Sequence, residues 1–543
     1  MAQSSGGFRN AGAIMMASLF LSRVLGIVRD MVAAAMFGQN IHTDAYRISY
    51  QIPDLLFFLV AGGALSSAFI PVFSEYIHTD REDDAWQVFS AVLCVMSLIL
   101  ILFIAAAWVF APQLAVLICG QKQFAVQEVT MMSRIVLPSQ FAFFIGALMM
   151  GTLYSKGVFS VPGLGPNIYN IGIIAGALLL GHVVHPGVAG MSWGATIGAI
   201  VANLIVPAFA VKKIGVKFTP TLSIAHPGVK KVFRLMLPVI LGLSLPGVYA
   251  LILQYFSTYF PEGSNSAVDA ANRLMQAPLA IFGQSLALAA FPVLSQFWAQ
   301  EKREAFGQQL TKSLKTVIYL SLPVSALMIA LPTPIVKVLL EHGAFTPEDT
   351  ARTASVLQTF SFGVAAWCLH PLLMRAYFSM QKNVKPIVMG TIATVIFLAI
   401  GIGILALHLP IETFGFAGSI SASLLVIAMV VDLKREDSNL DTQEVVKSIG
   451  LCGLASAATG AIAFGGGLLL LRFVHSKVVF LVALAVLSIS CMWVYYLVAK
   501  ALGVKEGQYL ERARRRLDKK GAVDAESETL PPVPDSLGPD ELG

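Results

Sequence analysis

Long apolar runs separated by short polar segments make up most of the chain. Each run approaches or exceeds the roughly 20 residues that a helix needs to cross a bilayer, so the pattern predicts fourteen membrane-spanning helices. The predicted spans are residues 11–36, 50–77, 86–111, 131–155, 165–181, 188–211, 232–256, 266–297, 314–337, 352–379, 386–408, 412–433, 446–471 and 478–500. The predicted fold is all-α and polytopic.

The composition agrees with this prediction. The 543 residues are 56% hydrophobic and 13% charged, whereas soluble proteins carry about 25% charged residues. The net charge of +6 does not require a nucleic acid partner, because cytoplasmic loops of membrane proteins are rich in Lys and Arg. The five cysteines form no CxxC pair, so we expect no disulfide framework, metal site or cofactor. The first run has full span length and no small-residue cleavage site, so we expect no cleaved signal peptide.

The basic residues predict the orientation. With the N-terminus inside, 26 of the 37 Lys and Arg residues fall in inside segments, and seven fall in outside segments or at span edges, including Arg47 and Lys122. Because inside loops of membrane proteins carry the excess of positive charge, both termini are expected to be cytoplasmic.

The remaining four basic residues lie inside predicted spans: Arg23, Arg29, Arg273 and Arg375. An arginine within the membrane costs at least about 2.5 kcal/mol and usually faces a bundle interior or a water-filled cavity. Arg375 lies near a cytoplasmic end, from which its side chain could reach water. A purely structural arginine, paired with an acid inside the bundle, is the alternative interpretation for each.

Two of these arginines belong to the stretch "SRVLGIVRD". On a helix that turns 100° per residue, its polar and small residues fall within an arc of about 120°. These residues are Ser22, Arg23, Gly26, Arg29 and Asp30. We expect this arc to face a cavity near the middle of the membrane, which Asp30 shares with Arg23.

The chain contains an internal repeat. "PVFSEY" begins at Pro71 and "PVLSQF" begins at Pro292, and a second matching pair joins Ser155 to Ser379. The offsets are 221 and 224 residues. Six predicted spans separate the copies, so the two halves have the same orientation, and transporters built this way bind substrate between their halves.

The repeat and the spans together predict four parts. Two six-helix lobes cover 1–212 and 213–435, and the last two spans, within 436–501, lie outside the repeat. The cytoplasmic tail, 502–543, begins with a basic helix from Leu510 and ends in an acidic, proline-rich segment expected to be disordered.

Several stretches resemble the MurJ (MviN) lipid II flippases of the multidrug/oligosaccharidyl-lipid/polysaccharide exporter superfamily, mainly over residues 8–435. They are "SRVLGIVRD", "TDAY", "ALSSAFIPVFSEY", "GPNIYNIGIIAGALLL", "NRLMQAPLAIFG", "EHGAFTPEDT" and "RAYFSMQKNVKP". The resemblance implies a non-enzymatic protein of the bacterial cytoplasmic (inner) membrane, with two lobes around a cationic cavity and a lipid-tail groove at the last two spans. The implied cargo is lipid II, an undecaprenyl pyrophosphate carrying a disaccharide-pentapeptide. Membrane lipids and cell-wall synthesis proteins would be its partners.

The sequence also departs from the family pattern. In the second span Phe57, Phe58 and Gly62 replace two arginines and a glutamate, and in the eighth span Asn272 replaces an acid. Asp269, one turn before Arg273, could supply the lost charge.

Ten residues are predicted to contact the substrate: Ser22, Arg23, Gly26, Arg29, Asp30, Asp44, Asp269, Asn272, Arg273 and Gln276. Asp44 and Asp54 match family positions near an outer gate, but capping of a helix end explains them equally well.

Two other functions stay open. One is an exporter of the same superfamily that carries another lipid-linked saccharide or a drug, which the missing charges on the second span favour. The other is an intramembrane enzyme acting on polyprenyl lipids, which would need paired acids or a metal cluster on the loops, and the sequence contains no such group.

Overall fold

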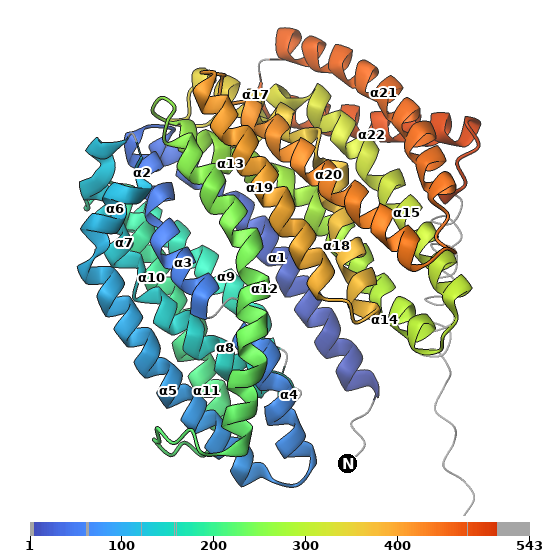
Figure 1. The fold of residues 1–543 in the computed structure, drawn as a ribbon. Coiled ribbons are helices and arrows are strands. Elements are labelled where there is room, and N and C mark those ends of the chain that lie inside the picture. The colour runs from blue at the N-terminus through green and yellow to red at the C-terminus, as the bar shows by residue number, and fades with distance from the viewer. Residues whose placement is uncertain are drawn as a thin grey trace, which may run out of the picture.

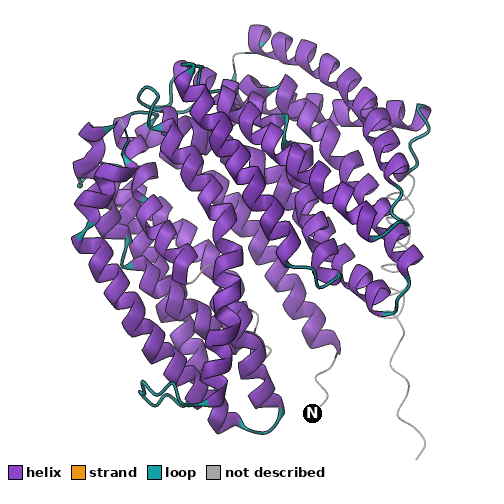
Figure 2. Cartoon of the chain, viewed as in Figure 1, coloured by secondary structure: helices purple, strands orange, loops and turns teal. Residues whose placement is uncertain are grey.

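The computed structural model describes residues 5–60, 64–120, 122–156, 158, 160–474 and 476–507. All regular secondary structure in this part of the chain is helical (Figure 2). The predicted basic helix from Leu510 and the acidic tail lie outside the described residues, as does Gly62.

The predicted spans coincide with helices throughout. Ten described helices are long and apolar enough to cross a membrane, and α17 and α18, bent by 49° at their junction, would together form an eleventh. The other three predicted spans correspond to α1, to α3 with α4, and to α12.

The helices that precede α12 form the N lobe; α2 to α11 lie at the left of Figure 1, and α1 runs across its centre. They are α1 (Ser5–Phe37), α2 (Ile41–Ser49), α3 (Gln51–Val60), α4 (Ala64–His78), α5 (Glu82–Val109), α6 (Ala111–Ile118), η1 (Gln123–Ala125), α7 (Val126–Val136), α8 (Ser139–Ser155), α9 (Ser160–Ala175), η2 (Gly176–Leu180), α10 (Ala189–Ala199), η3 (Ile200–Ile205) and α11 (Val206–Lys213).

The helices that follow α12 (Pro227–Ser257) form the C lobe and two additional helices. They are α13 (Ser264–Pro278), η4 (Leu279–Gln284), α14 (Ser285–Ala299), α15 (Arg303–Ala330), α16 (Pro332–Leu340), α17 (Pro347–Ser361), α18 (Val364–Ser379), α19 (Val384–Ala406), α20 (Thr413–Glu436), α21 (Thr442–Phe473) and α22 (Lys477–Ala501). Pro71 in α4 and Pro292 in α14 lie within corresponding helices of the two lobes, as the repeat predicts.

The helix α12 packs against both lobes. Val229, Val232 and Met236 near its start belong to the apolar core of the N lobe, whereas Leu253 and Phe256 near its end belong to the core of the C lobe. Part of the N-lobe core therefore comes from residues after 212, where the sequence pattern divides the lobes.

The last two helices, α21 and α22, pack on the outside of the C lobe (Figure 1). Ala463 of α21 and Leu484 and Cys491 of α22 form a small apolar cluster with Leu327 and Leu331, at the end of α15. The two helices thus pack against the C lobe.

Candidate functional site

The polar arc predicted for "SRVLGIVRD" lies on α1. Arg23 is exposed, and no neighbouring helix comes within 4 Å of the position that a Cβ at Gly26 would occupy. Ser22 is half-buried, and its carbonyl oxygen accepts a hydrogen bond of 3.3 Å from Asn170 Nδ2 on α9. This part of α1 therefore has one side against α9 and an open side that carries Arg23.

Arg29 and Asp30 form an ion pair within the arc. Arg29 Nε and Nη2 donate to Asp30 Oδ1 at 3.0 and 2.9 Å, and Arg29 Nη1 donates to Asn170 Oδ1 at 3.1 Å. Only 14% of the Arg29 side chain is exposed. Asp30 therefore orients Arg29, and Asn170, which sequence reasoning missed, fixes the other side of the guanidinium.

A second group of charges comes from α2 and α13. Asp269 Oδ2 accepts a hydrogen bond from Arg273 Nε at 2.7 Å and lies 3.0 Å from Arg47 Nη1. The predicted pairing of Asp269 with Arg273 is thus confirmed. Arg273 Nη1 in turn lies 3.9 Å from Asp30 Oδ2 on α1, which joins the two groups.

We call these five side chains the charge cluster: Arg29, Asp30, Arg47, Asp269 and Arg273. Three cations and two acids give it a net charge of +1. Three of its members line a cavity of about 90 Å³ at the junction of α1, α2, α10, α13 and the α16–α17 region. The three are Asp30, Arg47 and Arg273.

Several other predicted contact residues lie away from this cavity. Asn272 is half-buried and Gln276 is exposed, and neither lines it. Arg23 lies seven residues before Asp30, about 10 Å further along α1. The structure thus brings together Arg29, Asp30, Asp269 and Arg273. Ser22, Arg23 and Gly26 lie earlier on α1, and Asn272 and Gln276 of α13 lie outside the cavity lining.

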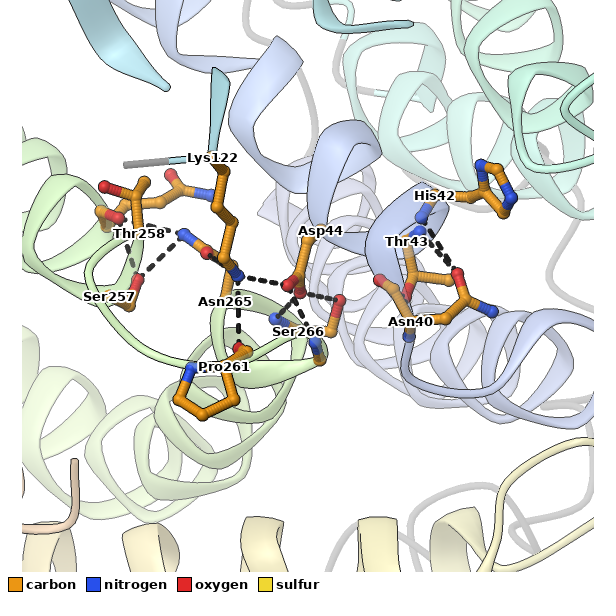
Figure 3. Close-up of polar contacts among 12 residues, drawn as sticks. Asn40, His42, Thr43, Asp44, Lys122, Ser257, Thr258, Pro261, Asn265 and Ser266 are labelled. Atoms are coloured by element: carbon orange, nitrogen blue, oxygen red, sulfur yellow. Dashed lines mark hydrogen bonds and ion pairs between the residues drawn. The ribbon is translucent and has the colours of Figure 1, made fainter. Parts of the chain in front are cut away.

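Asp44 is fully buried and takes part in a different network (Figure 3). Its Oδ2 accepts from Lys122 Nζ at 2.5 Å and from the backbone N–H of Gly263 at 2.8 Å. Its Oδ1 accepts from the N–H and the hydroxyl of Ser266 at 2.8 and 2.9 Å. Lys122 also donates to Asn265 Oδ1 at 2.9 Å. We call Asp44, Lys122, Asn265 and Ser266 the interlobe latch.

The latch occupies the carboxylate of Asp44, one of the predicted substrate contacts, in this conformation. All four hydrogen bonds to its carboxylate come from protein groups, and the carboxylate has no exposed surface. Capping does occur at the start of α2, but Asn40 provides it. Asp44 instead joins α2 of the N lobe to the beginning of α13 in the C lobe.

Two further contacts join the lobes beside the latch. The N–H of Ala344 donates to the carbonyl oxygen of Ala35 in the last turn of α1 at 2.7 Å, and Gln39 Nε2 donates to Thr353 Oγ1 at 2.7 Å. Gly343 allows the first contact because its φ is +57° and a Cβ there would lie 2.1 Å from the Ala35 carbonyl oxygen.

These interlobe contacts all lie toward one end of the molecule. The hydrogen bonds and ion pairs described above between the N lobe and residues 248–436 come from residues 30–47 and Lys122 on the N-lobe side. By the predicted orientation, this is the outer end.

The second span and Arg375 add little to the charge cluster. Phe57 packs edge-to-face against Phe143, with ring centroids 6.2 Å apart, in place of the arginine expected from the family pattern. The side chain of Phe58 lies outside the described residues. The guanidinium of Arg375 lies 5.3 Å from the ring centroid of Phe291, inside the C lobe.

Most of the chain matches a family of known proteins. The family described as "Lipid II flippase MurJ" matches residues 33–494. A probable lipid II flippase MurJ of Buchnera aphidicola subsp. Acyrthosiphon pisum is 30% identical over 366 residues, 67% of this chain and 71% of its own length. The corresponding protein of Thermotoga maritima is 28% identical over 505 residues, 92% of this chain and 96% of its own.

Solved structures share the fold. A lipid II flippase MurJ in an inward closed conformation superposes with a TM-score of 0.74 at 24% identity, covering 89% of this chain and 98% of that one. An inward-facing multidrug resistance transporter of the MATE family gives 0.62 at 14% identity, with 76% and 98% covered.

Proposed function

The chain belongs to the lipid II flippase MurJ family, and from this we propose that it carries lipid II from the inner to the outer leaflet of the bacterial cytoplasmic membrane. It would act without cleaving or extending its cargo, and both chain termini would lie in the cytoplasm. The cargo has a pyrophosphate head too polar for the bilayer and a polyprenyl tail too apolar for water.

The observation that carries this proposal is the net positive charge cluster beside a cavity between the lobes. Arginine presents a planar fork of N–H donors that binds phosphate oxygens with two parallel hydrogen bonds. Arg273, with 38% of its side chain exposed, donates to one acid at hydrogen-bond distance, so other donors stay available to an anion. Arg23, exposed further along α1, would contact the head as it enters.

The distribution of interlobe contacts supports an alternating-access cycle. The latch and its neighbouring contacts hold the lobes together at the predicted outer end, so the cavity would be reached from the cytoplasmic side in this conformation. Outward release would require the latch to open and the other ends of the lobes to close.

The charge cluster also suggests how cargo binding affects the lobes. Arg273 of the C lobe lies between Asp269 of its own helix and Asp30 of the N lobe. A pyrophosphate bound to Arg273 would compete with Asp30 for the same guanidinium. Binding of the anion would then weaken one of the contacts that join the lobes.

Replacement of an endogenous flippase tests the proposal. We expect this protein to support growth and normal shape in a bacterium depleted of its own lipid II flippase, at matched membrane abundance. Arg134→Ala serves as a control, because that guanidinium lies over the Trp108 ring within the N lobe, 4.5 Å from its centroid. Failure of the wild-type chain to rescue growth, despite normal abundance, would contradict the proposal.

One observation favours a different cargo. Phe57 makes an aromatic contact where a cavity arginine is expected, so the cavity carries less charge than the family pattern implies. An exporter of another lipid-linked saccharide or a drug would fail the rescue test and would instead move its own cargo in vesicles. Lipid II recovered cleaved or extended from those vesicles would indicate an enzyme.

A further inference from the structure

The segment 214–226, which links α11 to α12, alternates polar and apolar side chains. Lys217, Thr219, Thr221, Ser223 and Ala225 line a cleft that they share with α5. The intervening residues are Phe218, Pro220, Leu222 and Ile224. Alternate side chains of an extended chain point to opposite sides, so the segment presents one face to α5 and an apolar face away from it.

Three contacts hold this segment along α5. Lys217 Nζ lies 2.6 Å from Asp83 Oδ1, His226 Nε2 lies 3.7 Å from Asp84 Oδ1, and the N–H of Thr219 donates to Ser90 Oγ at 3.1 Å. Ser90 lies eight residues after Glu82, the first residue of α5, which is about 12 Å along the helix. The segment therefore runs beside α5, and Thr219 lies beyond residue 86, at which the third predicted span begins.

The face that points away from α5 is apolar and exposed. Phe218 is 47% exposed, Leu222 is 60% exposed and Ile224 is 57% exposed. Figure 1 shows the segment at the outer edge of the N lobe, beside the ends of α5 and α11 and away from the C lobe. At this depth and on this side, lipid is the medium that would surround these three side chains.

Basic residues flank the apolar face. Lys212 and Lys213 end α11, Lys230 lies in the first turn of α12, and all three are exposed. None of them has an ion pair with another described residue, whereas the nearby acids Asp83 and Asp84 are paired with Lys217 and Arg81. The charge left free at this edge is positive, which suits the anionic headgroups of an inner leaflet.

We propose that residues 212–230 form a membrane-surface anchor, in which Phe218, Leu222 and Ile224 insert at the boundary between headgroups and acyl chains of an anionic leaflet. The lysines hold the headgroups, and the polar face keeps the segment on α5. Such combined apolar and basic contacts are how interfacial segments bind membranes. Naming this leaflet as the inner one rests on the proposed orientation; the anchor itself does not depend on transport.

The anchor lies where it can steady one lobe. It is attached to α5 and leads directly into the first residues of α12, which pack in the N-lobe core. It would hold the N lobe at a fixed depth while the C lobe moves. The segment that follows the sixth span of the C lobe, residues 437–441, has only five residues and is too short to do the same.

Spin labels in nanodiscs test this anchor. A nitroxide is placed at Leu222→Cys or Ile224→Cys, with Ser223→Cys as the matched control on the other face. The nitroxide signal from native cysteines is measured on the parent chain. In discs containing phosphatidylglycerol, labels at 222 and 224 should be relaxed mainly by oxygen, which concentrates in lipid. The label at 223 should be relaxed mainly by a water-soluble nickel chelate.

Two further variants complete the test. Lys212→Gln with Lys213→Gln should move the label at 222 toward water in phosphatidylglycerol discs and have less effect in phosphatidylcholine discs. Phe218→Ser with Ile224→Ser should move the label at 222 toward water in both kinds of disc. The Tm in detergent should stay unchanged, because these two side chains are exposed. Equal nickel access at 222 and 223 would overturn the proposal, since the apolar face would then lie in water. No step uses lipid II, so the result is independent of the proposed transport function.

Discussion

The interlobe latch and the charge cluster both place charged side chains between the same two lobes, yet they differ in what their polar atoms can still do. In the latch, Asp44 and Lys122 are 0% and 3% exposed, and the Asp44 carboxylate receives four hydrogen bonds from protein groups. In the charge cluster, Arg273 is 38% exposed and donates to one carboxylate at hydrogen-bond distance. A ligand site differs from a structural contact in having hydrogen-bond donors that protein groups do not occupy, and not in charge alone.

The largest effect on stability is expected in the latch. Lys122→Met leaves the Asp44 carboxylate buried without its counter-ion, which typically costs about 3–5 kcal/mol. We expect a markedly lower Tm in detergent. Lys122→Met combined with Asp44→Asn should recover much of that loss. A single variant with the wild-type Tm would show that water reaches the latch.

The largest effect on transport is expected in the polar arc of α1. Arg23→Ala with Arg29→Ala should remove flipping while the protein remains folded and inserted, because Arg23 is exposed and Asp30 keeps Arg273 nearby when Arg29 is lost. Arg29→Lys should be partly active, since lysine lacks the guanidinium fork. Complementation and Tm are measured together. A stable double variant that still supports wall synthesis would contradict the cavity role, and a large fall in Tm would favour the purely structural interpretation.

A smaller effect tests whether acids in the cluster are interchangeable. Asp269→Asn removes the partner of both Arg47 and Arg273, so transport should fall several-fold. Adding Asn272→Asp should restore part of it by returning an acid one residue from Arg273. The readout is flipping per unit of membrane protein. No recovery would mean that the Arg47 contact, which residue 272 does not replace, is essential.

The orientation can be checked with no expected loss of activity. Cysteines at Glu262 and Gln308 should be labelled from opposite sides of the membrane, Glu262 from outside. Gly263 is unsuitable, although the sequence pattern places it in the same loop, because its φ is +82° and a Cβ there would lie 2.4 Å from Arg352 Nη1. Labelling of both positions from one side would overturn the predicted number of spans between them.

The smallest effect is expected in the C-terminal tail. Truncation after Lys520 removes a segment whose apolar residues are scattered among acidic residues and prolines, so rescue of growth should stay near normal. The comparison is made at equal membrane abundance. Loss of rescue without loss of protein would show that the tail has a function of its own.

Periodicity and span length predicted the helices well, because each span is a local pattern read within about 20 residues. The Asp269–Arg273 pair was also predictable, since it lies one helical turn apart. Arg47 and Lys122 were assigned to the outer loops and edges, and no local signal marks their partners, which lie 222 and 143 residues away at Asp269 and Asn265. Contacts between lobes depend on how the helices are packed, which hydrophobic pattern does not specify.

The double packing of α12 sets an order for synthesis. The chain leaves the ribosome from its N-terminus, and domains generally fold as they emerge. The first lobe stays incomplete until Met236 has been made, and the same helix then supplies Leu253 and Phe256 to the second. A chain divided between residues 213 and 226 would separate the first lobe from part of its own core. The two halves, although they repeat one another, are therefore not independent folding units.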